Sequence, residues 1–314
     1  MSMELFKANT QIDFMGWRRV MAVVLALLIA TSAASLALRG LALGLDLTGG
    51  VLIEMAYADP VDMADVRAKL KSAGYADAVV QSYGSPRDVM VRLAPRADED
   101  NEVLSTKVLA ALSGQQHEDV TVRRVEYVGA QVGEELTEQG ALAVLVALLG
   151  ILIYVAFRFE WRFALGAVLA TVHDTIFTLG FFSLFQVEFD LTVLAAVLAV
   201  IGYSLNDTIV VFDRIRENFR RMRAGTVAEV MNAAINQTLS RTIMTSFTTL
   251  LVVIALYLFG GAVVRGFSLA LIIGILIGTV SSIYVASPLA LWLGVSRADL
   301  LPDKRTGDES DGRP

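Results

Sequence analysis

The chain has 314 residues, of which 55% are hydrophobic and 18% are charged, and its formal net charge is −6. An ordinary soluble domain is about 45–50% apolar, so this composition favours a membrane protein. The acidic balance of residues 39–135 argues against a nucleic-acid partner for that segment. The chain has no cysteine, which excludes disulfides, thiolate metal sites and cysteine nucleophiles.

Six long apolar runs dominate the sequence. A helix needs roughly 20 apolar residues to cross the hydrocarbon of a bilayer, and its backbone groups must bond within their own segment. The runs predict six membrane-spanning helices at residues 20–38, 140–157, 163–185, 191–212, 242–264 and 266–295.

The first run allows a second interpretation. It follows Arg18 and Arg19, and the small residues Thr31–Ser35 follow an apolar stretch, an order that also occurs in cleaved signal peptides. Residues 20–38 form a run longer than the usual signal-peptide core of about 7–15 residues. We therefore expect a retained helix.

The segment at residues 39–139 predicts a compact α+β domain. Strand-like and helical stretches alternate in the order βαββαβ, which matches a ferredoxin-like unit. The expected strands are residues 45–57, 78–83, 89–93 and 120–128, and the expected helices are residues 61–72 and 99–112.

The distribution of Lys and Arg predicts the orientation of the spans, because short cytoplasmic loops are enriched in these residues. Basic residues precede the first span, separate the second from the third, and gather between the fourth and fifth. We expect residues 1–19 and the tail at 296–314 in the cytoplasm, and residues 39–139 outside it, which for a bacterial protein is the periplasm.

Residues 213–241 are apolar on one side and polar on the other, with a break at Gly225. This pattern predicts one or two short helices lying on the cytoplasmic face. The tail after Arg297 is polar and is expected to be disordered.

Asp207 is the most informative residue, because it interrupts an otherwise apolar span. A carboxylate inside a membrane costs a few kcal/mol and usually faces a bundle interior or a wet cavity. Such a group can load and release a proton, although a carboxyl group that only holds helices together remains the structural alternative. Its neighbour Asn206 could pair with it.

Three more ionisable side chains stand in or beside the spans. Arg241 precedes the fifth span and a stripe of Thr and Ser, so it either anchors the helix end or pairs with Asp207. His173 and Asp174 lie near the middle of the third span, where they could relay protons or form an interhelical hydrogen bond.

Other features have structural interpretations. Asp213 and Arg214 end a span and are expected to be interfacial anchors, whereas Gly274 and Gly278 indicate close helix packing. The glycine-rich stretch at residues 44–50 lacks the Lys-Ser/Thr of a phosphate loop and predicts a turn and strand. No nucleotide site, metal cluster or nucleophilic triad is recognisable, so no cofactor is expected and energy would come from an ion gradient or a partner.

Several motifs together resemble the SecF family, the subunits of the bacterial SecDF protein-export complex, which is similar to the RND transporter superfamily. Residues 44–50 resemble the glycine-rich signature of the family, with Leu47 where Phe is usual. The strongest match is VIGYSLNDTIVVFDRIREN at residues 200–218. Further matches are VGAQVGEEL at 128–136, FRFEWR at 157–162, the His173-Asp174 pair, SRT at 240–242 and YLFGG at 257–261.

The resemblance implies a function that composition and spacing do not. A member of this family is expected in the bacterial inner membrane as an accessory subunit, not an enzyme, that uses the proton gradient to promote preprotein export. Its expected partners are SecD, the SecYEG channel, the exported unfolded preproteins and the lipid bilayer, with YajC and YidC as further candidates. In the family, the Asp of the YSxND motif and the Arg of the SRT motif are implicated in proton passage, and they correspond to Asp207 and Arg241.

Two other functions are compatible with a bundle of six spans. An RND-like exporter of small molecules or lipids would need larger outer domains with a substrate cleft, and the chain has one outer domain of moderate size. A scaffold without transport would have little need of a costly carboxylate in mid-span. The residues are compatible with coupling to sodium ions as well as to protons.

Overall fold

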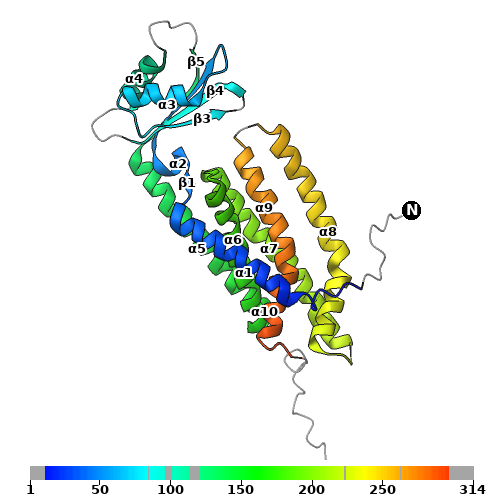
Figure 1. Cartoon of the computed structure of the whole chain (residues 1–314). Coiled ribbons are helices and arrows are strands. Elements are labelled where there is room, and N and C mark those ends of the chain that lie inside the picture. Colours follow the sequence, from blue (N-terminus) through cyan, green and yellow to red (C-terminus); the bar gives the residue numbers. More distant parts are fainter. Residues whose placement is uncertain are drawn as a thin grey trace, which may run out of the picture.

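The computed structural model describes residues 11–83, 85–95, 101–113, 120–222, 224–261 and 263–296. It consists of a helical bundle with a small sheet domain at one end (Figure 1). Among the described residues, six helices are long and apolar enough to cross a membrane. The predicted fold class is thereby confirmed. The predictions for residues 1–10, for Arg223 and for the tail after Ser296 lie outside the described residues.

The bundle is arranged in two layers of burial. Helices α6, α7 and α9 form its centre, whereas α1, α5 and α8 expose most of their apolar surface. The helices are α1 (Arg18–Arg39), α5 (Ala130–Arg158), α6 (Trp161–Phe185), α7 (Leu191–Arg221), α8 (Val227–Phe259) and α9 (Arg265–Ser281), which continues through the π-helical segment η1 (Ser282–Ala286) into α10 (Ser287–Trp292).

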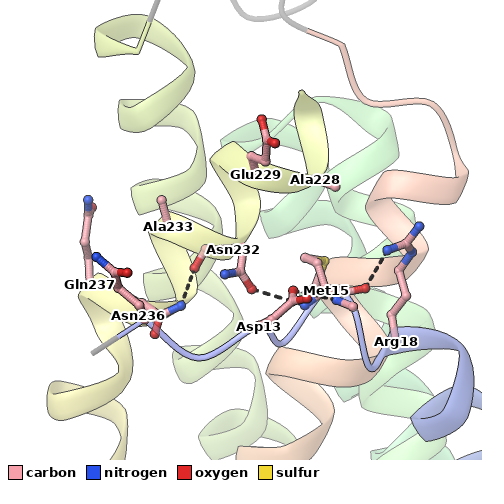
Figure 2. Close-up of a pocket in the computed structure, with 11 residues that line it drawn as sticks. Asp13, Met15, Arg18, Ala228, Glu229, Asn232, Ala233, Asn236 and Gln237 are labelled. Carbon is pink, nitrogen blue, oxygen red and sulfur yellow. Dashed lines mark hydrogen bonds between the residues drawn. The ribbon is translucent and has the colours of Figure 1, made fainter. Parts of the chain in front are cut away.

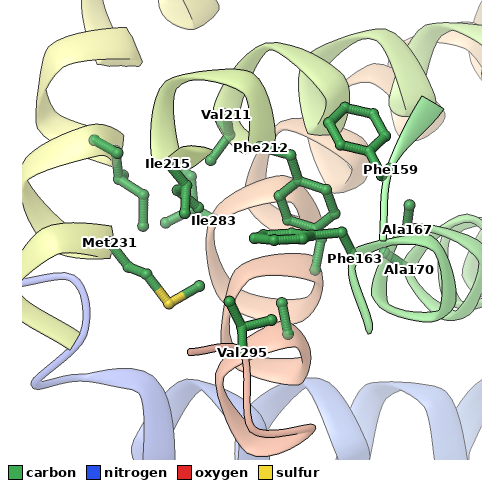
Figure 3. Packing of buried hydrophobic residues seen from close by; sticks show 14 of the residues in the cluster. Phe159, Phe163, Ala167, Ala170, Val211, Phe212, Ile215, Met231, Ile283 and Val295 are labelled. Atoms are coloured by element: carbon green, nitrogen blue, oxygen red, sulfur yellow. The ribbon is translucent and has the colours of Figure 1, made fainter. Parts of the chain in front are cut away.

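The bundle end that lies far from the sheet domain has an aromatic core (Figure 3). The ring of Phe163 packs edge to face on that of Phe212, with centroids 4.8 Å apart, and Phe159 contacts the same ring at 5.9 Å. Met231 closes the cluster from α8, and Val295 closes it from the segment that follows α10. This packing fixes the ends of α5, α6, α7 and α8 relative to one another.

The sheet domain is the expected ferredoxin-like unit. Its four strands are antiparallel in the order β3-β4-β2-β5, and its two helices share a core with the sheet. The side chains at the centre, among them Ile53, Val91 and Leu104, are fully buried. The elements are β2 (Gly50–Tyr57), α3 (Met63–Ser72), β3 (Val79–Tyr83), β4 (Ser85–Leu93), α4 (Asn101–Ser113) and β5 (Val120–Val128).

The junction between the two parts differs from the prediction. Residues 45–48 were expected in a strand but form a helical turn, α2 (Leu45–Thr48). The alternating leucines suggested a strand. However, Gly49 and Gly50 have φ angles of +70° and +118°, which break the extended backbone before β2 begins. Both leucines are buried in the turn.

Two short strands complete this junction. Strand β1 (Ala42–Leu43) follows α1 and pairs in parallel with β6 (Glu188–Phe189), which lies between α6 and α7. The amide of Gly44 extends the pairing by donating to the carbonyl of Phe189 at 2.8 Å. On the other side, Thr137 of α5 donates to the carbonyl of Leu47 at 3.0 Å.

The prediction of separate surface helices within residues 213–241 was wrong. The segment instead continues α7 to Arg221 and starts α8 at Val227. Its apolar stripe is buried in the aromatic core of the bundle rather than laid on a membrane surface. Gly225, with a φ angle of +101°, forms the turn, and Thr226 and Glu229 form a capping box that begins α8.

Candidate functional site

Asp207 lies inside the bundle on α7, with only 3% of its surface exposed. Its Oδ2 atom is buried and has no hydrogen-bond partner among the described residues. A buried polar group without a partner is costly, and this one is a carboxyl group in an apolar span. The structure thus places the most informative residue of the sequence in the protein interior.

A second buried carboxyl group, on α6, contacts the residue of α7 that lies one helical turn before Asp207. Asp174 of α6 is 1% exposed and accepts a hydrogen bond from the hydroxyl of Ser204 through its Oδ2 atom. Ser204 precedes Asp207 by three residues, so the two share one face of α7 with a rise of about 4.5 Å between them. The predicted residues Asp174 and Asp207 therefore belong to one polar interior.

His173 extends this interior on the α6 side. Its Nδ1 atom lies 2.9 Å from Oδ1 of Asp174, and its Nε2 atom is buried without a hydrogen-bond partner among the described residues. One imidazole nitrogen therefore contacts a carboxylate while the other is unused. This arrangement is suited to accepting or passing a proton.

Arg241 differs from its expected position. It does not open a helix but lies 14 residues after Val227, the first residue of α8, and its side chain is exposed. Its charge acts on Asp207 electrostatically, yet the structure shows no salt bridge between the two described side chains. Asn206 is also exposed, so it points away from the polar interior that contains Asp207.

A chain of hydroxyl groups crosses three helices beside the carboxyl groups. Tyr203 of α7 donates to Ser246 of α8 at 3.2 Å, and Ser246 lies 2.7 Å from Thr279 of α9. The hydroxyls of Thr242 and Ser281 are buried without hydrogen-bond partners among the described residues. These groups supply donors and acceptors that a moving proton or water would need.

Glycines allow this close approach of the helices. A Cβ atom added at Gly278 of α9 would lie 3.1 Å from the Cβ atom of Ser204, and one at Gly274 would lie 2.1 Å from a methyl group of Val200. The predicted packing role of these glycines therefore holds for the contact between α9 and α7.

Sequence reasoning did not single out Tyr203, Ser204 or Thr279. The position of Ser204, one helical turn before Asp207, was the available signal.

The bundle end far from the sheet domain has its own polar contacts. Arg158, at the end of α5, donates from one nitrogen to both carboxylate oxygens of Asp213 at 2.7 Å. Arg214 pairs with Glu217 at 2.8 Å along α7. These pairs are largely exposed, as expected of anchors at a membrane surface, and each contributes little to stability.

The segment before α1 crosses the start of α8 (Figure 2). Asn232 accepts from the amide of Met15 at 3.1 Å, and Asn236 accepts from the amide of Ile12 at 2.9 Å. Both asparagines also donate to the carbonyl of Ile12. A groove of about 660 Å³ remains beside this segment. The two asparagines therefore hold the chain's own backbone and tie α1 to α8.

Comparisons with known proteins assign these features to one family. Residues 107–296 match the C-terminal region of the SecD/SecF protein export membrane proteins, and residues 34–61 match the SecD/SecF GG motif. The chain is 53% identical over 313 residues to the protein translocase subunit SecF of Vibrio alginolyticus, which covers 99% of each chain. It is 52% identical to the same subunit of Pseudomonas aeruginosa, which covers 96% of this chain and 98% of that one.

A solved structure is similar as well. The crystal structure of SecDF, a translocon-associated membrane protein of Thermus thermophilus, matches with a TM-score of 0.82 and 40% identity over 92% of this chain. The match spans only 39% of that longer SecDF chain. SecDF in its super-membrane-facing form matches with a TM-score of 0.67 over 91% of this chain. The curated relatives are named as translocase subunits, and no catalytic activity is part of those names.

Proposed function

The chain belongs to the SecF family of protein translocase subunits, and on this premise we propose that it works with a SecD subunit and uses the proton gradient to promote preprotein export across the bacterial inner membrane. The relatives support a role in protein export. The use of the proton gradient is our inference from the interior of the bundle.

The buried carboxyl group of Asp207 carries the proposal. Its Oδ2 atom is unsatisfied, the Asp174 carboxyl group of α6 binds Ser204 one helical turn away on α7, and the charge of Arg241 acts on it from α8. Moving one elementary charge across 100 mV is worth about 2.3 kcal/mol, which exceeds thermal energy several-fold. A carboxyl group that gains and loses a proton in this setting changes its preferred partner, and that change can favour a second arrangement of the helices.

The surface of the bundle supports a partner in the membrane. Arg241, Thr245 and Thr248 form an exposed stripe along α8, and Asn206 is exposed on α7. Lipid tails cannot satisfy a guanidinium group or an amide. The chain matches 39% of the solved SecDF chain, so the SecD part is the natural cover for this stripe. The SecYEG channel would supply the emerging preprotein, and YajC and YidC are further candidate partners by resemblance alone.

The orientation is part of the proposal. The bundle end with Arg158, Arg214, Arg216, Arg220 and Arg221 would lie in the cytoplasm together with both termini, since cytoplasmic loops are rich in Arg and Lys. The sheet domain would then lie in the periplasm. A cysteine engineered at Lys71 should react with an impermeant reagent from outside, and one at Arg221 only from inside. Reaction of both from the same side would refute this orientation.

The experiment compares Asp207→Asn with Asp213→Asn on the same helix. Asparagine keeps the shape of Asp207 and the ability to form hydrogen bonds but cannot ionise, so this variant should assemble with SecD and lose the part of export that a proton gradient stimulates. Asp213→Asn makes the same chemical change at an exposed ion pair and should export normally. Export of a secreted protein is measured in inverted membrane vesicles with and without the gradient.

One result would refute the coupling role of Asp207. If Asp207→Asn assembles and exports at the wild-type rate under a full gradient, the coupling role fails and a scaffold takes its place. Arg241→Met should lose gradient-stimulated export as Asp207→Asn does. Arg241→Lys should recover part of the export, because lysine restores the positive charge but not the planar guanidinium group.

A further inference from the structure

One ion pair joins the sheet domain to the loop that precedes α7. Arg92 of β4 places its Nη1 atom 3.1 Å from Oε1 of Glu188 on β6. The same nitrogen donates to the carbonyl of Leu43 on β1 at 2.5 Å. The side chains are 18% and 31% exposed, so both are largely withdrawn from water. Arg92 thus holds both strands of the small parallel sheet at once.

The covalent connections of the sheet domain do not reach α7. The domain is attached to the bundle through α2 at its start and through α5, which follows β5, at its end. The Arg92–Glu188 pair adds a contact with the segment that leads directly into α7. Gly44 makes room for this contact, because a Cβ atom there would lie 3.2 Å from Oε1 of Glu188 and 3.0 Å from the Cβ atom of Asp190.

The next residues link this contact to the polar interior. Asp190, two residues after Glu188, is the N-cap of α7, and its Oδ1 atom accepts from the amide of Val193 at 2.8 Å. Helix α7 then runs without a break past Asp207. The rise from Asp190 to Asp207 is about 25 Å at 1.5 Å per residue, and a packed helix moves over that length as one body.

We propose that Arg92 and Glu188 are positioning residues for the export cycle, and that their contact transmits movement of α7 at Asp207 to the sheet domain. This inference rests on the proposed function, which supplies the source of the movement. The contact itself, which we call the joint, is the Arg92–Glu188 ion pair between the sheet domain and the segment before α7. The β1–β6 pairing joins only the chain that enters the domain to the segment before α7, whereas the half-buried Arg92–Glu188 pair joins a strand of the sheet itself to that segment.

The surroundings of Glu188 make this joint sensitive to protons. Burial raises the pKa of the Glu188 carboxyl above its ordinary value of 4.5, and the acidic neighbours Asp190 and Asp46 raise it further, while Arg92 lowers it. Arg265, which begins the nearby α9, is directed to the ring of Tyr257 instead. Contact with Arg92 favours the charged form of Glu188 and so lowers its affinity for a proton. Because the two equilibria are linked, protonation of Glu188 must weaken the contact with Arg92 by the same factor.

The strength of the Arg92–Glu188 ion pair depends on pH. The ion pair contributes fully when the pH is above the pKa of Glu188, and its contribution is lost as the pH falls through that value. Because the pKa is raised, the loss begins at a higher pH than for an ordinary glutamate. The proposed orientation exposes the joint to the side from which protons enter.

The test uses the full chain together with its partner subunit in membranes. The chain has no cysteine, so spin labels can be attached at engineered Lys71→Cys in α3 and Val263→Cys before α9, both of which are exposed. Their distance distribution reports how firmly the sheet domain is held. The variants are Arg92→Gln, the nearly isosteric Glu188→Gln and the charge-conserving Arg92→Lys.

The control variant is Arg123→Gln. It removes an ion pair with Asp88 that lies wholly within the sheet domain, at 2.9 Å, and so makes the same chemical change without touching the joint. The two Gln variants at the joint should broaden the distance distribution and reduce gradient-stimulated export about fivefold or more. Arg92→Lys should retain most of both readouts, and Arg123→Gln should leave both unchanged.

A second comparison separates coupling from stability. Asp207→Asn should shift the distance distribution when Arg92 is present and should have no further effect in Arg92→Gln. Additive effects of Asp207→Asn and Arg92→Gln on the distance distribution would overturn the proposal. A wild-type distance distribution and wild-type export in Glu188→Gln would overturn it too, as would equal losses of export in Arg92→Gln and Arg123→Gln. If Asp207→Asn exports normally, the proposed function fails, yet the response of the label distance to Arg92→Gln still decides whether the joint exists.

Discussion

The contact between α7 and α9 predicts a graded response to alanine at three glycines. A Cβ atom at Gly274 would lie 2.1 Å from a methyl group of Val200, and one at Gly278 would lie 3.1 Å from the Cβ atom of Ser204. One at Gly202, on the exposed side of α7, meets nothing within 4 Å. The three substitutions are chemically identical and differ only in what the new methyl group meets.

The expected magnitudes follow from two opposing effects. Replacing glycine by alanine inside a helix stabilises it by about 0.5–1 kcal/mol, and forcing a methyl group into a packed contact costs about 1–3 kcal/mol. Gly202→Ala should therefore raise the melting temperature by about 2 °C. Gly274→Ala should lower it by about 5 °C, because Val200 is β-branched and cannot turn away.

Gly278→Ala should separate stability from function. The contact needs a shift of only a few tenths of an ångström, so the two stability effects nearly cancel. However, Ser204 is held by its hydrogen bond to Asp174, so even a small shift disturbs the polar interior. We expect a melting temperature within about 2 °C of wild type and reduced gradient-stimulated export.

Thermal unfolding of the purified chain in mild detergent, followed by tryptophan fluorescence, measures the three shifts. Export in inverted vesicles measures the functional effect of Gly278→Ala. If Gly274→Ala is as stable as Gly202→Ala, α9 does not approach α7 at this point and the geometry described for the polar interior is wrong. If Gly278→Ala exports normally, the Ser204 contact has no part in the coupling.

Three more predictions follow from other parts of the molecule. Phe163→Ala should lower the free energy of unfolding by about 3–5 kcal/mol, measured by detergent-induced unfolding, because its fully buried ring packs against two other phenylalanines. Asn232→Ala or Asn236→Ala should make the segment before α1 more susceptible to protease, whereas Gln237→Ala, which makes neither contact, should not. The distribution of distances between labels at positions 71 and 263 should broaden as the pH falls towards the raised pKa of Glu188, and Glu188→Gln should remove that dependence.

The sequence was sufficient for the fold class because each element has its own strong local signal. Six apolar runs of sufficient length specify six spans, and the alternation of strands and helices specifies the ferredoxin-like order that the sheet shows. A single carboxylate in an apolar run likewise identified Asp207, whose role in proton passage remains a prediction. These signals depend on residue type and spacing along the chain alone.

The parts that were wrong depend on contacts between elements. Residues 213–241 have the pattern of helices on a membrane surface, and the same pattern suits helix ends that pack into a protein core, as Ile215 and Met231 do. The turn α2 resembled a strand because two buried leucines alternate in it. The contacts of Tyr203 with Ser246, and of Arg92 with Glu188, join residues far apart in sequence, so no local pattern could predict them.

Helix α7 connects these separate observations. Its 31 residues span about 46 Å, well beyond the roughly 30 Å of hydrocarbon, so one rigid element includes the junction, the polar interior and the aromatic core. At the core end it is held by packed rings and by the Arg158–Asp213 pair. At the other end it packs into a second buried cluster that includes Phe182, Val193 and Val197, and it is joined to the sheet domain through β6 and the Arg92–Glu188 contact. Because α7 is packed along its length, a displacement at Asp207 reaches both ends. The Arg92–Glu188 contact is therefore where a change of charge at Asp207 should become movement of the sheet domain.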